Sequence, residues 1–413
     1  MVKNLLAHDL TDNNSLLLKL IYLLSLALPL TLLSGPFLPD LILSLIALFY
    51  LFFISKKDFK NMKVLKISKI FLVLFLILLT SILFSDDQRA LKVLFIFRFF
   101  FYFFSILILI NNFKNYIKVF SSFLKIIIFI FILDIFFQFV FGFNILGLKP
   151  ISRGSGDFFA YTSFFADEKI AGSFLVRLLP LVIFFYLINN FDTNYQNFKI
   201  FTLLIIFVLS SFLSGERTAF VNAILIAFLV NIYLIKINKK NIIFIFILLL
   251  LPTLIYLLNI NQSKKIVNDT INQIGLGIND KKILLFSSTH ERYARISLEI
   301  FLENKILGVG PKAFKKECIK KYNVKKCNTH PHNIFFQVIS ELGILGALLY
   351  IGLLFSIIAQ VLNCIMKSNP KFLIYLDIFI LLNPFLPSGS LFNNWLLIIH
   401  FISLPYLYVK IHR

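Results

Sequence analysis

The sequence predicts an all-α polytopic membrane protein with about twelve transmembrane helices and one large loop outside the membrane. Two observations lead to this fold class. Hydrophobic residues make up 59% of the 413-residue chain and charged residues only 15%, with a mean hydropathy of +0.88, far above soluble domains. Apolar stretches long enough to cross a bilayer also recur along the whole chain.

The apolar stretches divide the chain into three parts. Residues 1–259 contain the first nine predicted spans with short loops, residues 260–333 form one large loop, and residues 334–413 contain the last three spans. Several spans are close to the shortest length that crosses a bilayer, so their number is predicted to within one or two. The predicted spans are 16–34, 38–55, 70–84, 91–110, 119–141, 171–189, 200–214, 218–235, 242–259, 334–362, 372–387 and 393–409.

The net charge of +21 is distributed in a way that predicts orientation rather than nucleic-acid binding. Lysines gather in short loops on alternate sides of successive spans, as in residues 56–69 and 236–240. The positive-inside rule makes these loops and both termini cytoplasmic and places the large loop outside. Long loops cross the membrane largely regardless of charge, so the lysines of the large loop fit this orientation. We expect membrane lipid, not nucleic acid, as the partner of these cations.

The most distinctive polar motif is His330-Pro331-His332-Asn333, where the large loop meets the tenth span. Pro331 fixes its own φ and favours extended backbone at His330, which is typical of a turn that begins a helix. His332 then lies beside the free N–H groups of the helix N-terminus, which favour anions. A neutral, water-facing imidazole there can transfer protons at neutral pH. Two histidines that merely cap the helix fit the motif equally well.

Cys318 and Cys327 lie nine residues apart in the large loop. In an oxidising compartment this pair predicts a disulfide, which would contribute about 2–3 kcal/mol in the chain-entropy model. The alternative is a zinc site that adds His330 and His332, although the spacing matches no common zinc pattern.

Polar insertions on the outer side supply arginines. In the large loop, residues 291–302 are amphipathic, with Arg292 and Arg295 on one face of a helix expected to end near Asn304. Arg217 follows a tight turn between the seventh and eighth spans, a depth at which an ionisable residue marks a candidate site. Arginine suits phosphate because its planar fork donates two parallel hydrogen bonds. For residues 291–302 the alternative is a helix that lies on the membrane surface, and for Arg217 the alternative is a side chain that snorkels to the lipid headgroups.

The order of these features resembles the O-antigen ligase and polymerase superfamily of bacterial envelope glycosyltransferases. His332-Asn333, nine further residues and Gly343-x-x-Gly346 are similar to the family's histidine motif with its GxxG. The turn around Arg217 resembles the family's arginine turn, and residues 292–310 resemble its loop helix with a Gly-x-Gly exit.

The resemblance covers about residues 140–400 and includes the topology. Residues 153–172, which begin with Arg153, resemble the family's outer segment before the sixth span. Arg177 lies within the sixth span itself. Two arginines, Arg292 and Arg295, stand where the family has a single essential one, and we favour Arg292.

The resemblance implies a GT-C-like fold that transfers a glycan from undecaprenyl pyrophosphate with inversion, without nucleotide sugar, metal or other cofactor. The site would face the periplasm from the bacterial inner membrane. Arg217 and Arg292 would clamp the pyrophosphate, and His332 would act as general base on the acceptor hydroxyl, a gain of about 10²–10⁴-fold. Other expected roles are substrate contact by Arg295, Arg153, Arg177, Asn333 and His330, orientation of the imidazole by Asn333, and close helix packing at Gly343 and Gly346.

Three functions remain open on the sequence alone. A ligase would move the glycan onto lipid A–core, and we lean towards it because the chain has one compact loop. A polymerase would move the glycan onto another lipid-linked repeat unit. A transporter or flippase for the same lipid-linked glycan is a third class, but such proteins usually have two repeated halves with polar residues near the bilayer midplane. We find no similarity between halves in this chain.

Overall fold

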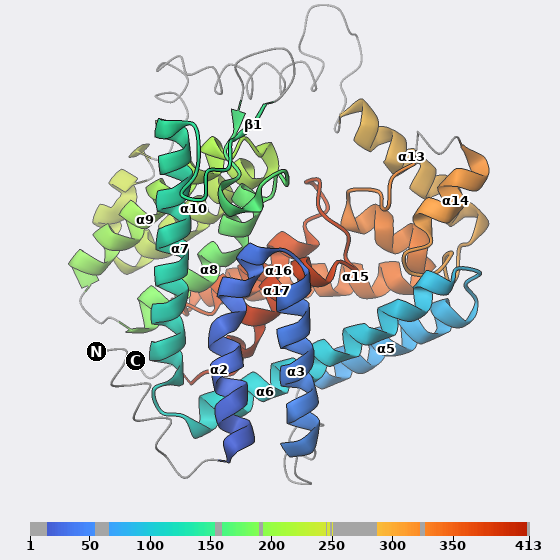
Figure 1. Cartoon of the computed structure of the whole chain (residues 1–413), viewed down its shortest axis with the longest axis horizontal. Helices are drawn as coiled ribbons and strands as arrows, with labels where there is room; N and C mark the ends of the chain where they lie inside the picture. Colours follow the sequence, from blue (N-terminus) through green and yellow to red (C-terminus); the bar gives the residue numbers. More distant parts are fainter. Residues whose placement is uncertain are drawn as a thin grey trace, which may run out of the picture.

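The computed structural model describes residues 15–53, 66–152, 159–189, 193–244, 246–247, 250, 287–322 and 327–410. The described chain is mostly helical (Figure 1), which confirms an all-α membrane protein. Within it, seven helices are long and apolar enough to cross a membrane, and four shorter apolar helices accompany them. One two-stranded antiparallel ribbon pairs β1 (Ile151–Ser152) with β2 (Phe159–Ala160).

Each predicted span overlaps helical residues. The ninth, 242–259, lies mostly outside the described residues, and those of its residues that are described, 242–244, 246–247 and 250, are helical. The α-helices are α2 Leu16–Thr31, α3 Phe37–Phe53, α5 Lys66–Leu83, α6 Phe97–Asn112, α7 Tyr116–Phe141, α8 Ala171–Asn189, α9 Thr193–Leu213, α10 Arg217–Ile237, α13 Ser288–Glu303, α14 Phe314–Lys321, α15 Ile334–Met366, α16 Phe372–Leu382 and α17 Asn394–Ser403. The 3₁₀ turns are η1 Leu32–Ser34, η2 Gln88–Ile96, η3 Ser163–Phe165, η4 Lys239–Asn241 and η6 Leu404–Tyr408.

Helix α8 forms the centre of the bundle. Its apolar window is 72% buried, a larger share than in the other six long helices. It packs against α7, α9, α10, α16 and α17, so that elements from the middle and the C-terminal part of the chain surround it. The predicted spans 372–387 and 393–409 are shorter in the structure. Because α16 has 11 residues, it extends only about 17 Å, roughly half of the bilayer core.

Between α16 and α17, residues 383–393 are not helical. Asn383, Ser388 and Ser390 place polar groups along this loop. Irregular backbone between apolar helices is tolerated where it is buried in protein or lines a cavity. We call residues 383–393 the polar loop.

Helix α15 is interrupted at Gly343, which has a left-handed φ of +63°. The turn after α13 fills the interruption: Ile344 N–H donates to the Lys305 carbonyl at 2.8 Å, and Val309 N–H donates to the Ser340 carbonyl at 3.0 Å. A Cβ at Gly343 would lie 2.4 Å from the Ile306 carbonyl oxygen. The expected helix–helix packing at Gly343 is therefore wrong, since this glycine admits the backbone of a loop. A Cβ at Gly346 would meet Leu342 of the same helix.

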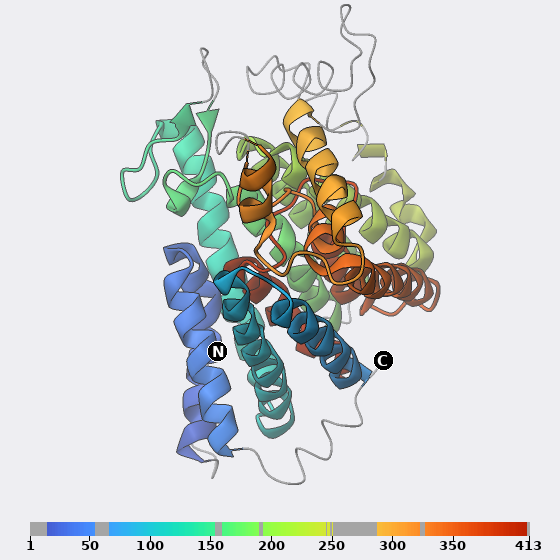
Figure 2. The same cartoon turned by 90° about the vertical axis from the view of Figure 1, so that its right-hand side faces the viewer.

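Helices α13 and α14 lie together beside α15, on the right in Figure 1 and towards the viewer in Figure 2. They share a small core of Tyr293, Ile296, Ile300, Phe314 and Cys318. Helix α13 ends at Glu303, with Asn304 as its C-cap, as the sequence predicted.

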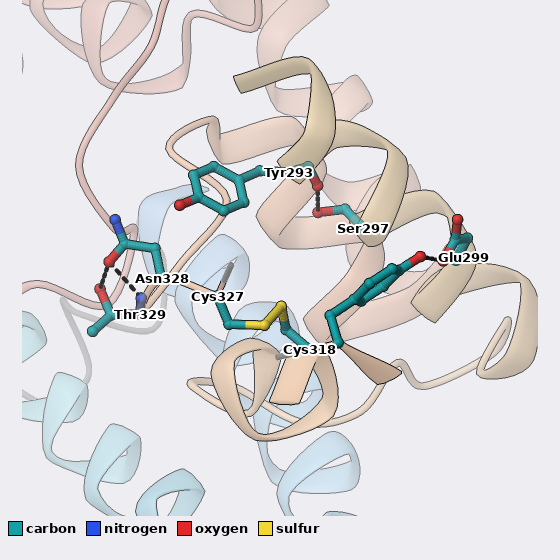
Figure 3. The surroundings of a disulfide bond; sticks show 8 residues. Tyr293, Ser297, Glu299, Cys318, Cys327, Asn328 and Thr329 are labelled. Atoms are coloured by element: carbon teal, nitrogen blue, oxygen red, sulfur yellow. Dashed lines mark hydrogen bonds between the residues drawn. A yellow bond between two sulfur atoms is a disulfide. The ribbon is translucent and has the colours of Figure 1, made fainter. Parts of the chain in front are cut away.

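The predicted disulfide between Cys318 and Cys327 is confirmed, with Cα atoms 5.8 Å apart (Figure 3). Because the two sulfur atoms are bonded to each other, they do not provide the thiolates of the alternative zinc site. The bond joins α14 to the chain that leads into the histidine motif, close to the Tyr322 hydroxyl that donates to Glu299 of α13.

Candidate active site

Three imidazole rings gather where the large loop meets α15. The ring centroids of His330 and His332 lie 4.3 Å apart, and His290 of α13 lies 5.6 Å from His332. The ring of Tyr293, also on α13, is 5.8 Å from His332. His290 was not predicted from the sequence. It lies three residues before Tyr293, on the helix face that is buried, and this periodicity is the signal that could have indicated it.

His332 has a left-handed backbone, with φ of +59°. Such a conformation is uncommon outside glycine and is often found at functional sites. The polar loop supports it, because Ser388 N–H donates to the His332 carbonyl at 2.8 Å. On the side chain, the Asn328 Nδ2 lies 2.6 Å from His332 Nε2. His332 is thus held from both the backbone and the ring.

Asn333 has a different role from the one expected. Its Oδ1 accepts from Phe336 N–H at 3.2 Å, which makes it the N-cap of α15, and its Nδ2 donates to the Pro384 carbonyl at 2.7 Å. Both ends of this buried amide are therefore used to join α15 to the polar loop. Asn328, rather than Asn333, contacts the imidazole.

The tautomer of His332 follows from its neighbours. Thr329 N–H donates to Asn328 Oδ1 at 2.7 Å (Figure 3), which turns the amide nitrogen of Asn328 towards His332. An amide nitrogen can only donate, so His332 Nε2 accepts and carries a lone pair. The ring nitrogen with basic character is therefore Nε2.

The surroundings keep all three imidazoles neutral at neutral pH. Burial, and then the repulsion that a protonated His332 would exert, lower the pKa of His330 to about 4. A hydrogen bond with the Ser388 backbone opposes this shift. Burial and then the charge of His290 lower the pKa of His332. Burial and then the charge of Arg217 lower the pKa of His290. Neutral imidazoles can accept protons.

Arg217 is the first residue of α10, and its guanidinium acts electrostatically on His290. The preceding residue, Glu216, fixes this helix end. Its carboxylate accepts from Gly172 N–H at 2.7 Å and from the Ser173 hydroxyl, both at the start of α8. Gly172 permits the close approach, since a Cβ there would lie 2.2 Å from Ser214 Oγ. Glu216 therefore joins the N-termini of α8 and α10 and sets the position of Arg217.

Arg177 lies one turn further into α8 and is buried. Its Nε has no hydrogen-bond partner in the described part of the chain. Glu216 and Asp377 interact favourably with its guanidinium through electrostatics. It lines a small pocket between α8, α10 and the polar loop, which we call the Arg177 pocket. Other residues lining it include Ser173, Thr218, Asn222, Asn383 and Ser388. Because Ser388 also binds the His332 backbone, this pocket borders the histidine site.

The structure separates the two arginines of α13. The Arg292 Cζ lies 5.3 Å from the ring centroid of Tyr293, the same ring that packs near His332. The Arg295 side chain is 74% exposed, and its Nη2 lies 3.9 Å from Glu291 Oε1. Both arginines are exposed, and Arg292 is the one that lies over the ring of Tyr293. Arg153 lies outside the described residues.

Part of the chain that carries these residues is similar to a known protein family. A model of the O-antigen ligase family matches residues 202–351, from α9 into α15. The matched segment includes Arg217, His290, Arg292 and His332, whereas Arg177 and the polar loop lie outside it. No curated protein matches the chain.

Proposed function

We propose that the protein is a membrane glycosyltransferase of the ligase type, because a model of the O-antigen ligase family matches residues 202–351. It transfers a glycan from undecaprenyl pyrophosphate to lipid A–core at the periplasmic face of the inner membrane. One observation carries this proposal: a neutral His332, supported by His290 and Tyr293, lies in the same matched segment as Arg217 and Arg292.

The proposed reaction needs a base and a cation site. The acceptor hydroxyl displaces the Asn328 amide from the lone pair of His332 Nε2 and hydrogen-bonds to this nitrogen in its place. As the hydroxyl oxygen attacks the anomeric carbon, its proton passes to His332 Nε2 and the bond from this carbon to the phosphate oxygen breaks. The pyrophosphate leaves with the bonding electrons and carries its own negative charge, so it needs cations rather than a proton. Arg217 and Arg292 supply them, and attack from the opposite face inverts the configuration.

The disulfide supports the proposed orientation. Disulfides form in oxidising compartments such as the periplasm, and Cys318–Cys327 lies in the loop next to His332. The lysine distribution favours the same side of the membrane for this loop.

Reconstitution tests the activity. Purified protein in liposomes, supplied with lipid-linked glycan and lipid A–core, should form the glycan–core linkage without nucleotide sugar. Passage of the glycan across the bilayer without a new linkage would instead show transport and overturn the proposal.

The acceptor distinguishes ligase from polymerase, because both use the same donor site. The lipopolysaccharide of a deletion strain separates them. Loss of all glycan-capped molecules is expected for a ligase, whereas survival of molecules capped with a single repeat unit would show a polymerase.

A further inference from the structure

A second cavity borders the histidine site and shares no lining residue with the Arg177 pocket. It is a cleft of about 490 Å³ between the start of α3, η2, the turn before α14 and the end of the polar loop. We call it the Lys312 cleft. His330, two residues before His332, lines it. In the polar loop, Asn383 and residues 386–388 thus line one cavity, and Ser390, Phe392 and Asn393 line the other.

Lys312 gives the cleft a cation that the protein does not neutralise by contact. Within the described part of the chain, its ammonium has neither an ion pair nor a hydrogen bond, while Lys92 and Arg98 repel it and Asp40 and Glu341 attract it from a distance. Its backbone is left-handed, with φ of +64°. A half-buried lysine in a strained turn is costly to maintain, which favours a role in binding.

The carboxylates at the cleft are already engaged by arginines. Asp40 accepts from Arg98, which also donates to the Ser44 hydroxyl at 2.8 Å. Asp87 accepts from the Arg89 Nη2 at 2.6 Å, while Arg89 itself stays 47% exposed at the cleft. Of the charged side chains that line the cleft, Asp40 and Arg89 are therefore paired within the described part of the chain, and Lys312 is left to bind an anion.

The remaining lining has the chemistry of a sugar site. Aromatic rings border the cleft beside amide and hydroxyl groups, a mixture that provides both apolar faces and hydrogen bonds to a ligand. These residues are Phe37, Phe392, Trp395, Thr329, Ser390 and Asn394.

We propose that the Lys312 cleft is the acceptor subsite and that Lys312, assisted by Arg89, binds a phosphate or carboxylate on an acceptor sugar. The inference rests on the proposed transfer reaction and adds the place of the second substrate. The donor pyrophosphate is bound beside Arg217 and the Arg177 pocket, the acceptor enters from the cleft, and the two meet at the histidine turn, residues 329–333.

The test is steady-state transfer by Lys312→Gln with donor and acceptor varied separately. We expect the KM for the acceptor to rise about tenfold, as for loss of a hydrogen bond to a charged group, with the KM for the donor unchanged. Lys312→Arg should keep near-normal kinetics. Lys305→Gln, an exposed lysine in the preceding turn, is the matched control and should behave as wild type.

A second arm removes the charge from the acceptor. With an acceptor stripped enzymatically of phosphate, wild type and Lys312→Gln should have the same KM. The same comparison with acceptor sugars whose carboxylate has been reduced identifies the other source of charge. A tenfold difference that persists with an uncharged acceptor, or a change in the donor KM alone, would overturn the assignment.

Binding separates this inference from the proposed reaction. If the wild-type protein transfers no glycan, the proposed function fails, but the cleft is still testable by the thermal shift that charged acceptor causes in detergent-solubilised protein. A shift in wild type and Lys305→Gln that is lost in Lys312→Gln supports the cleft. An equal shift in all three refutes it.

Discussion

Two histidines of this protein, His332 and His400, lie in opposite kinds of environment. His400 of α17 is 3% exposed, and its Nδ1 lies 2.8 Å from the Asp377 carboxylate of α16, which also accepts from the Ser403 hydroxyl. The neighbours of His332 are an amide, two imidazoles and a phenol ring. A carboxylate holds Nδ1 of the interior histidine, whose Nε2 has no hydrogen-bond partner among the described residues, whereas the site histidine keeps a neutral ring with a basic nitrogen.

The two environments give histidine two different roles, a structural role at His400 and a chemical role at His332. A buried imidazole paired with a carboxylate stabilises the packing of two short helices, and removing the imidazole leaves the buried carboxylate without this hydrogen-bond partner. An imidazole beside cations and other imidazoles is kept neutral, which is the state a general base requires. Each of the following experiments tests one side of this comparison.

The largest effect is expected for His332→Ala. Loss of the base should lower the rate of glycan transfer by about 10²–10⁴-fold, while the thermal unfolding temperature stays close to wild type. Transfer in liposomes and thermal unfolding in detergent measure the two quantities. Normal transfer by this variant would remove the assignment of the base.

His400→Ala should show the reverse pattern. Leaving the Asp377 carboxylate without its buried partner should lower the free energy of unfolding by about 3–5 kcal/mol. The folded fraction should transfer glycan at the wild-type rate, measured per folded molecule. The interior interpretation is wrong if the rate falls while the stability does not.

The two arginines of α13 provide a matched pair. Arg292→Lys should reduce transfer by about tenfold or more, because a lysine lacks the fork that binds two phosphate oxygens. Arg295→Lys should stay within about twofold, because the nearby partner of Arg295 is Glu291, whereas Arg292 lies over the Tyr293 ring beside His332. Initial rates at saturating donor compare them, and equal rates for both variants would contradict the clamp.

The smallest effect concerns pH. Folding lowers the pKa of His330 to about 4 and also lowers those of His332 and His290, so the unfolded chain binds more protons below about pH 6.5. Stability contributed by these neutral rings is present above that pH and is lost as the pH falls towards about 4. Transfer should persist below the pH at which a free imidazole is half protonated. Unfolding temperatures and transfer rates measured between about pH 4 and pH 7 check the stability and the activity, respectively. A transfer rate that already halves above about pH 6.5 would contradict neutral imidazoles in the site.

Several parts of the site could be predicted because their signals are local. The start of a helix after residues 330–333 follows from a turn motif, the end of α13 near Asn304 from helix periodicity, and the Cys318–Cys327 disulfide from short spacing. Arg217 was identified because a charge at the boundary of apolar spans is conspicuous. Each of these needs only a few neighbouring residues.

Other parts depend on contacts between distant segments. His290 approaches His332 only because α13 packs on α15, and Gly343 breaks its helix because the turn at residues 305–309 enters the gap. The role expected for Asn333 on the imidazole belongs to Asn328, since the polar loop takes up the Asn333 amide. No local pattern encodes these choices.

The sequence by itself determined the membrane class, nearly all the helices and the residue types available for chemistry, because hydropathy and periodicity act over one helix at a time. Only the tertiary structure decided which of these residues share a cavity, how α15 bends and where Lys312 lies relative to His330. The reason is physical: such positions follow from packing and hydrogen bonds between segments far apart in the chain, and these form only when the whole bundle is assembled.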